Sequence, residues 1–290
     1  MILYFKSPGS LGGLLFLNGN LMSLILTSEG AAESASYFES KLNVEHSVYE
    51  VIRIIDGVAL FLEDHFQRLS VSTDLQKMNL QLEFQEFKTI ISELTRRNRQ
   101  FEGNVKFSCS QIDNQVQWVC SFIPHSYPMA ADYHKGVKTD LLFAERKNPN
   151  AKVVQTSVRD RANREIAEKG LYEVLLVNKD KLITEGSRSN VFFVKDNQFY
   201  TAPVSMILEG VTRRKVFDCL HVLGFTVVEK AISSDRICDF EAAFLTGTSP
   251  KVLPVNSVGE QVFNVRNDAV TRLMDRYNRM IQEYIRNEKS

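Results

Sequence analysis

The sequence predicts a two-domain protein of mixed α-helices and β-strands, an α/β (α+β) fold. The chain has 290 residues, which is long enough for one large domain or two of modest size. Strand-like and helix-like segments alternate along it, and residues 124–136 interrupt them with two prolines and no hydrophobic period. We therefore expect a smaller N-terminal α/β domain over residues 1–123, a linker over 124–136 and a larger domain over 137–290.

The N-terminal part reads as strands followed by two helices. Asn18-Gly19 separates two apolar segments, which favours a β-hairpin over the apolar core of a signal peptide. Strands are expected at residues 48–55, 104–110 and 115–123, and helices at 63–76 and 82–100. The second helix is expected because apolar residues recur at helical spacing, namely Phe84, Phe87, Ile90, Ile91 and Leu94.

The C-terminal part alternates strands and helices. We expect strands at 172–178, 191–196 and 239–246. Helices are expected at 157–170 and 211–224, each ending at a glycine, and at 267–289. The last of these segments places its apolar residues on one face, which predicts a helix packed on the core.

The composition argues against a nucleic-acid-binding protein and against a membrane-spanning one. Apolar residues make up 44% and charged residues 24%, with 35 basic and 35 acidic side chains, so no bulk charge favours nucleic acid or an anionic membrane. The basic run at residues 146–152 is too short for a nucleic-acid site, and it reads as a solvated loop. No segment approaches the roughly 20 apolar residues of a membrane span.

The four cysteines predict free thiols in a reducing compartment. They stand at Cys109, Cys120, Cys219 and Cys238, without a CxxC pair or a histidine at ligand spacing. We therefore expect a cytoplasmic protein without a metal site.

The most informative segment is ITEGSRSNVFFV, Ile183–Val194, which places Glu185 in a bend rich in glycine and serine. Lys152 lies 33 residues upstream, and Arg68 lies further upstream. An enzyme that holds pyridoxal phosphate needs such a set: a lysine to form a Schiff base, a carboxylate for the pyridine nitrogen and an arginine for the phosphate. Taken singly, these residues could equally be a loop lysine, a turn carboxylate and a surface helix arginine.

Six motifs occur together in a recognisable order. They are VYEVIR (Val48–Arg53), HFQRL (His65–Leu69), Lys152, TEGSRSNVFF (Thr184–Phe193), LEGVTR (Leu208–Arg213) and LTGTSP (Leu245–Pro250). In this order they resemble the class IV aminotransferases, or fold-type IV pyridoxal-phosphate enzymes. That family includes branched-chain and D-amino acid aminotransferases and aminodeoxychorismate lyase. The resemblance implies a two-domain, D-amino acid aminotransferase-like fold with the cofactor between the domains, and a homodimer.

The resemblance also implies roles for individual residues. Lys152 is the catalytic lysine, which holds the cofactor and moves the α proton of the substrate, and Glu185 pairs with the pyridine nitrogen. The phosphate is held by Arg68 and by two loops that contribute Val211, Thr212, Gly247 and Thr248. Thr212 also reads as the N-cap of a helix that begins near Arg213, where backbone N–H groups attract an anion. Ordinary helix capping and an ordinary turn remain the alternatives for these loops.

The substrate side is less well defined. Tyr49, Arg188 and Ser249 are candidates for substrate contact, and Arg53 and Lys41 also remain open for the substrate carboxylate. Ser157 stands where many of these transaminases have a tyrosine. Residues 106–111 contain neither the arginine nor the histidine that the D-amino acid enzymes use.

These observations predict an aminotransferase that moves an amino group between an amino acid and a 2-oxo acid. Both substrates are small molecules. The first alternative is a lyase that resembles aminodeoxychorismate lyase and would release pyruvate without an amino acceptor. The second is a catalytically silent homologue that binds the cofactor or a partner protein.

Overall fold

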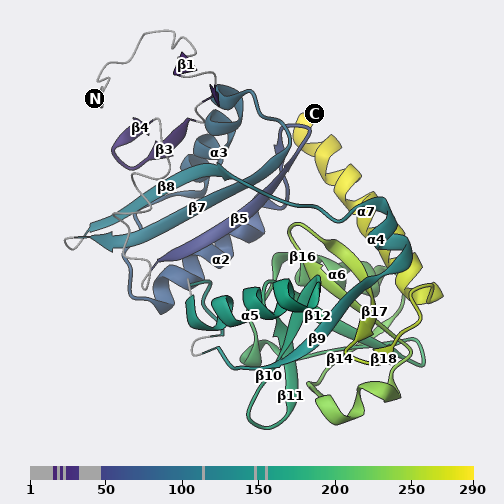
Figure 1. The fold of residues 1–290 in the computed structure, drawn as a ribbon. Coiled ribbons are helices and arrows are strands. Elements are labelled where there is room, and N and C mark those ends of the chain that lie inside the picture. Colours follow the sequence, from purple (N-terminus) through teal and green to yellow (C-terminus); the bar gives the residue numbers. More distant parts are fainter. Residues whose placement is uncertain are drawn as a thin grey trace.

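The computed structural model describes residues 16–17, 20–21, 24–32, 47–112, 115–146, 149–153 and 156–290. The fold is organised around two main sheets, each built by a consecutive part of the chain (Figure 1). The predicted Asn18-Gly19 turn and Lys41 lie outside the described residues. The segments beside that turn, β1 (Phe16–Leu17) and β2 (Asn20–Leu21), pair antiparallel as the hairpin prediction requires.

The first sheet is antiparallel, and its strands lie in the order β4-β3-β8-β7-β5-β6. Their bounds are β3 Ile25–Thr27, β4 Gly30–Ala32, β5 Val48–Ile55, β6 Val58–Ala59, β7 Gly103–Ile112 and β8 Gln115–Ile123. Helices α2 (Leu62–Leu75) and α3 (Phe84–Asn98) cover one face, and Val48, Ile52 and Ile54 of β5 are buried in the same core. The alternate residues of β5, among them Tyr49 and Arg53, therefore lie on the opposite face.

The second sheet is mixed and runs β14-β13-β12-β16-β17-β9-β10-β11-β15, with β18 paired to β17. Its strands are β9 Val137–Phe143, β10 Glu173–Val177, β11 Leu182–Gly186, β12 Asn190–Lys195, β13 Gln198–Thr201, β14 Thr226–Glu229, β15 Ile232–Ser233, β16 Ala242–Gly247, β17 Lys251–Val258 and β18 Gln261–Val262. The helices of this part are α4 Ala130–Lys135, α5 Thr156–Lys169, α6 Val211–Val222 and α7 Asp268–Lys289, with short 3-10 helices at Val204–Met206 and Ser234–Asp239.

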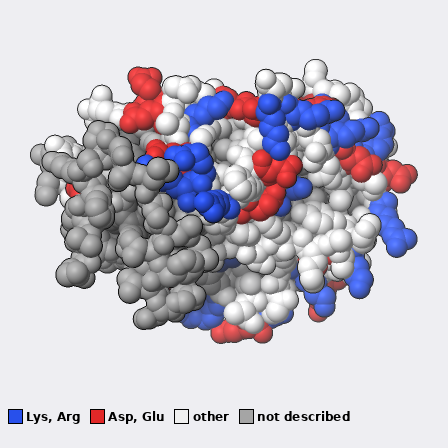
Figure 2. Space-filling model, turned by 90° about the horizontal axis from the view of Figure 1, so that it is seen from above, with Lys and Arg blue, Asp and Glu red and all other residues white. Residues whose placement is uncertain are grey.

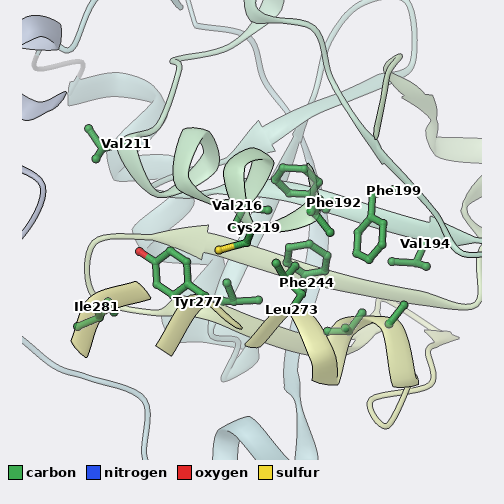
Figure 3. Packing of buried hydrophobic residues seen from close by; sticks show 14 of the residues in the cluster. Phe192, Val194, Phe199, Val211, Val216, Cys219, Phe244, Leu273, Tyr277 and Ile281 are labelled. Atoms are coloured by element: carbon green, nitrogen blue, oxygen red, sulfur yellow. The ribbon is translucent and has the colours of Figure 1, made fainter. Parts of the chain in front are cut away.

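A single apolar core joins α6 and α7 to this sheet (Figure 3). The rings of Phe192 and Phe244 stack with centroids 5.0 Å apart, and Tyr277 of α7 is buried in the same cluster. Val211, the first residue of α6, also belongs to this core. The packing of the core therefore fixes where α6 begins, which matters for the site described below.

The sequence predictions for the helices are confirmed, with ends displaced by one or two residues in most cases. Gly170 and Gly224 follow α5 and α6 with φ of 61° and 74°, so both glycines end their helices in the left-handed conformation as expected. Residues 124–136 differ from expectation because they include α4, which a capping contact stabilises: the Asp132 carboxylate accepts the Met129 N–H at 2.7 Å. The division into domains at this segment stays a prediction.

The surface carries both basic and acidic side chains, as the equal numbers of each in the sequence predict. Figure 2 shows basic and acidic side chains next to each other on the face seen from above. Within the described ranges, no helix combines the length and the hydropathy that crossing a bilayer requires, and no cluster of three histidine, cysteine or acidic side chains could hold a metal. All four cysteines are free.

Candidate active site

A pocket lies where the outer face of β5 meets the second sheet. Thr248 and Ser249, in the turn between β16 and β17, connect the two parts: Thr248 Oγ1 donates to the Val51 carbonyl at 3.3 Å, and Arg53 donates to the Ser249 carbonyl at 3.0 Å. The pocket is lined by nine of the site residues predicted from the sequence: Tyr49, Arg68, Lys152, Glu185, Arg188, Val211, Thr212, Gly247 and Thr248. Ser249 and Arg53, which was left open for the substrate carboxylate, are not part of this lining. Ser249 lies beside this lining, and its hydroxyl accepts from Asn104 at 2.9 Å.

Lys152 is held by its backbone on both sides. Its carbonyl accepts the Tyr49 N–H at 3.0 Å, and its own N–H donates to Ser72 Oγ at 3.2 Å. The Lys152 Nζ lies 4.7 Å from the centre of the Tyr49 ring. Burial lowers the pKa of Lys152 below its ordinary value, and the charges of Arg68 and Arg146 lower it further. An amine that loses its proton this readily is a good nucleophile.

Glu185 is buried at the end of β11 and is held by two donors. Leu208 N–H donates to Oε2 at 3.2 Å, and Arg146 Nη1 donates to Oε1 at 3.1 Å. Burial raises the pKa of Glu185 above its ordinary value, although Arg146 and the Leu208 N–H act in the opposite direction. The carboxylate can therefore pair with a further cation in the pocket.

Arg146 corrects the prediction of a solvated loop at residues 146–152. Its side chain is only 15% exposed, because it reaches Glu185 and also donates to the Ala151 carbonyl at 3.3 Å. The sequence gives no local signal for this contact, since the two residues are 39 positions apart. Arg146 is therefore a site residue that sequence reasoning missed.

Glu173 organises the bend that carries Glu185 and Arg188. This buried carboxylate accepts from Ser187 Oγ at 2.6 Å, from Ser189 Oγ at 3.0 Å and from the Arg188 N–H at 3.1 Å. A Cβ on Gly186 would lie 3.1 Å from Glu173 Cγ, so glycine allows the bend to approach this side chain. The sequence predicted the bend but not the carboxylate beneath it.

Arg68 belongs to a buried cluster with Glu50 and His65. Arg68 donates from Nε and Nη2 to the two oxygens of Glu50 at 2.7 and 2.6 Å, and His65 Nδ1 lies 2.7 Å from Glu50 Oε2. Burial alone would raise the pKa of Glu50, but Arg68 and the hydrogen bonds lower it to about 2. The alternation of β5 could have revealed Glu50, because this charged residue occupies a buried position of the strand.

The start of α6 provides donors for an anion. The helix begins at Val211 with Gly210 as its N-cap, and Arg68 Nη1 donates to the neighbouring Glu209 carbonyl at 3.3 Å. The prediction of Thr212 as N-cap is therefore wrong. The N-cap is Gly210, where a side chain would collide with Asn190, and the Thr212 hydroxyl bonds to Tyr277. The first N–H groups of a helix have no partner within it.

One buried hydroxyl at this end of the pocket also lacks a partner. Thr246 is 1% exposed, and its Oγ1 has no hydrogen-bond partner in the described part of the chain. Thr246, Gly247, Thr248, Arg68 and the start of α6 all line the pocket. A guanidinium, free helix N–H groups and an unused hydroxyl together fit a phosphate group.

Tyr49 faces the same pocket from β5. Its hydroxyl accepts from Arg159 Nη2 at 3.3 Å. Burial opposes ionisation of this phenol, but Lys152, Arg159 and Arg146 outweigh it and lower the pKa of Tyr49 to about 8. Tyr49 is thus an acidic phenol beside the lysine amine.

Comparison with known proteins places this geometry in a family. Residues 47–258 match the model of the amino-transferase class IV family. The chain is 29% identical to a D-alanine aminotransferase of Bacillus licheniformis over 74% of its length and 79% of that protein. It is 30% identical to a probable branched-chain-amino-acid aminotransferase of Thermotoga maritima, over 79% of its length and 82% of that protein.

Solved structures share the fold. A hypothetical aminotransferase from Mycobacterium tuberculosis, in its PLP-bound form, superposes with a TM-score of 0.77 at 19% identity, covering 89% of this chain and 98% of that one. A putative 4-amino-4-deoxychorismate lyase from Legionella pneumophila gives 0.75 at 20% identity, covering 81% and 91%. The family and the fold that the motifs predict are confirmed, and the chain belongs to the class IV aminotransferases.

Proposed function

We propose that this enzyme uses pyridoxal phosphate to move an amino group between an amino acid and a 2-oxo acid. The observation that carries the proposal is that Lys152, Glu185 and Arg68, far apart in sequence, line one pocket together with the start of α6. When bound, pyridoxal phosphate supplies an aldehyde carbon for a lysine amine and a ring that accepts electrons from the α carbon of the substrate.

The residues present suit that cofactor. Arg68, the N–H groups at Val211 and Thr212, and the turn at Gly247 and Thr248 would hold its phosphate, and the unused Thr246 hydroxyl adds a donor. Glu185 would hold the proton of the ring nitrogen, with Arg146 fixing the orientation of the carboxylate. Lys152 would hold the aldehyde carbon, and once released would move the proton of the substrate α carbon.

The substrate class is tested with amino donors of both configurations. The purified protein, loaded with pyridoxal phosphate, is incubated with D- and L-amino acids and 2-oxoglutarate or pyruvate, and formation of the new oxo acid is measured. The proposal expects turnover with at least one donor and transfer of the amino group to the acceptor. If pyruvate instead forms from 4-amino-4-deoxychorismate without an acceptor, the enzyme is a lyase.

We also propose an organisation for the whole protein. The first sheet and its helices would form one domain, residues 137–290 the other, and residues 124–136 the connection between them. The family resemblance supports a homodimer, and the four free thiols support a reducing, cytoplasmic location. Sedimentation equilibrium tests the dimer, which predicts twice the chain mass of 33.1 kDa.

A further inference from the structure

Two arginines in the pocket have no acidic partner in the described part of the chain. Among the described residues, four arginines line the pocket: Arg68, Arg146, Arg159 and Arg188. Glu50 pairs with Arg68, and Glu185 pairs with Arg146. Within the same described set, neither Arg159 nor Arg188 has a carboxylate oxygen within 4.0 Å. A pocket with such unneutralised guanidinium groups favours an anionic ligand.

Arg159 contacts the tyrosine that lies beside the reacting lysine. It is half-buried on α5, and its Nη2 donates to the Tyr49 hydroxyl at 3.3 Å, while the ring of the same tyrosine lies 4.7 Å from Lys152 Nζ. The first turn of α5 contains no acidic residue, so the helix N-terminus and Arg159 both add positive potential at this place. A cation at a helix N-terminus does not stabilise the helix, so helix stability does not explain the position of Arg159.

Arg188 is placed differently. It is exposed, and its Nη2 contacts the side chain of Asn163, one turn further along α5 from Arg159. The Arg188 guanidinium is thus already held by the Asn163 amide at the edge of the pocket.

A lysine also lies near Tyr49. It is Lys106 of strand β7, which pairs with β5, and its Nζ is 5.8 Å from the Tyr49 ring.

We propose that Arg159, together with the Tyr49 hydroxyl, binds the carboxylate of the amino-acid substrate. This inference rests on the proposed function. An amino group that replaces Lys152 Nζ has its carboxylate two bonds away, next to Tyr49, where the Arg159 fork can donate two hydrogen bonds. Carboxylate recognition would then come from α5 and not from the β7 segment, residues 106–111, which contains neither arginine nor histidine.

The test compares a ligand with and without a carboxylate. The loaded protein is mixed with D- or L-norvaline, or with butylamine, which is norvaline without its carboxylate, and the change of the visible cofactor band is followed. Arg159→Gln is expected to lower the second-order rate constant for norvaline by roughly 10- to 100-fold, because hydrogen bonds to a charged group are lost. The rate constant for butylamine should stay unchanged. Arg159→Lys should restore part of the norvaline rate.

A second measurement does not depend on turnover. Calorimetric titration with pentanoate, which is norvaline without its amine, should show binding to the wild type and the same loss of affinity in Arg159→Gln. Arg161→Gln is the matched control, because Arg161 is an exposed arginine of the same helix that does not line the pocket and donates to the Phe143 carbonyl at 3.2 Å. Circular dichroism of each variant establishes that it is folded.

The outcomes separate this proposal from the proposed function. A wild type without a cofactor band refutes the proposed function, and pentanoate titration of the cofactor-free protein still decides the role of Arg159. Equal losses for norvaline and butylamine, or a norvaline-specific loss in Arg188→Gln but not in Arg159→Gln, would overturn the assignment. So would a wild type that binds no pentanoate.

Discussion

Arg146 and Glu185 lie side by side in the pocket, with Arg146 Nη1 donating to Glu185 Oε1 at 3.1 Å. Glu185 is nevertheless 4% exposed and its pKa is raised, because loss of hydration outweighs the guanidinium and the Leu208 N–H. When folding raises the pKa of a carboxyl group, its protonated form contributes stability to the folded protein. This stability is fully present below the pKa of the unfolded chain, and it is lost as the pH rises through the pKa of the folded protein. Once ionised, the Glu185 carboxylate is therefore held at a cost in stability in the protein without cofactor.

Replacing Glu185 with glutamine should separate stability from activity. Glu185→Gln removes the buried charge but keeps an acceptor for Arg146, so we expect the free energy of unfolding without cofactor to exceed that of the wild type at pH values where Glu185 is ionised. Aminotransferase activity should fall by roughly 100-fold or more, since the amide cannot hold the ring proton. Urea unfolding and steady-state kinetics measure both, with Glu165→Gln as control, because Glu165 is half-buried and pairs with Lys169 on α5, outside the pocket. A less stable variant with full activity would contradict this role.

Glu50 should contribute to stability in the opposite sense. Its pKa is lowered to about 2, so the stability it provides is present above its ordinary value of 4.5 and is lost as the pH falls toward 2. Glu50→Ala leaves Arg68 buried without a partner, and we expect a loss of roughly 3–5 kcal/mol at pH 7. Chemical unfolding at several pH values should show the difference from the wild type shrinking below pH 4.5. The exposed Glu86→Ala serves as control, and a pH-independent difference would argue against a buried ion pair.

Tyr49 should titrate about two pH units below an ordinary tyrosine, at about pH 8. Absorbance at ~295 nm follows phenol ionisation, and the wild type should show one tyrosine with a pKa of about 8, absent from Tyr49→Phe. Because folding lowers this pKa from 10.0, the stability from Tyr49 is present above pH 10.0 and is lost as the pH falls through about 8. Arg159→Gln should raise the pKa, since it removes one of the neighbouring charges. An unchanged titration in Tyr49→Phe would show that another phenol is responsible.

Glu173 should act on the pocket through the bend above it. Glu173→Gln weakens the hydrogen bonds from Ser187, Ser189 and the Arg188 N–H, and we expect the affinity for pyridoxal phosphate to fall by roughly 10-fold. Titration of the cofactor-free protein with pyridoxal phosphate measures this affinity. Asp140→Asn is the control, because Asp140 lies on the neighbouring strand β9 but pairs with Lys169 at the surface. Equal affinities in both variants would mean that the bend does not need the Glu173 charge.

The sequence predicted the parts of the fold that depend on local patterns. The apolar repeat at Phe87, Ile91 and Leu94 forms the buried face of α3, and Gly170 and Gly224 end α5 and α6 in the left-handed conformation. These features follow from periodicity and backbone freedom within a few residues. The site residues on ordered motifs, such as Lys152 and Glu185, could be named because the motifs stand in the family order.

Contacts between distant segments escaped sequence reasoning. Arg146 reaches Glu185 across 39 residues, and Arg159 reaches Tyr49 across 110. Nothing in the residues around Arg146 distinguishes a pocket arginine from a solvated one before the strands are paired. Thr212 was misplaced for a similar reason, because the start of α6 depends on the packing of Val211 in the core, where it contacts residues distant in the sequence.

The most direct test of the account is borohydride reduction of the loaded protein, wild type beside Lys152→Ala, with absorption spectra before and after. We predict a visible band in the wild type that reduction bleaches, with the cofactor then fixed to the peptide that contains Lys152, and no such band in the variant. A label on Lys106, whose Nζ lies 5.8 Å from the Tyr49 ring, or a wild type that binds no pyridoxal phosphate, would contradict the account.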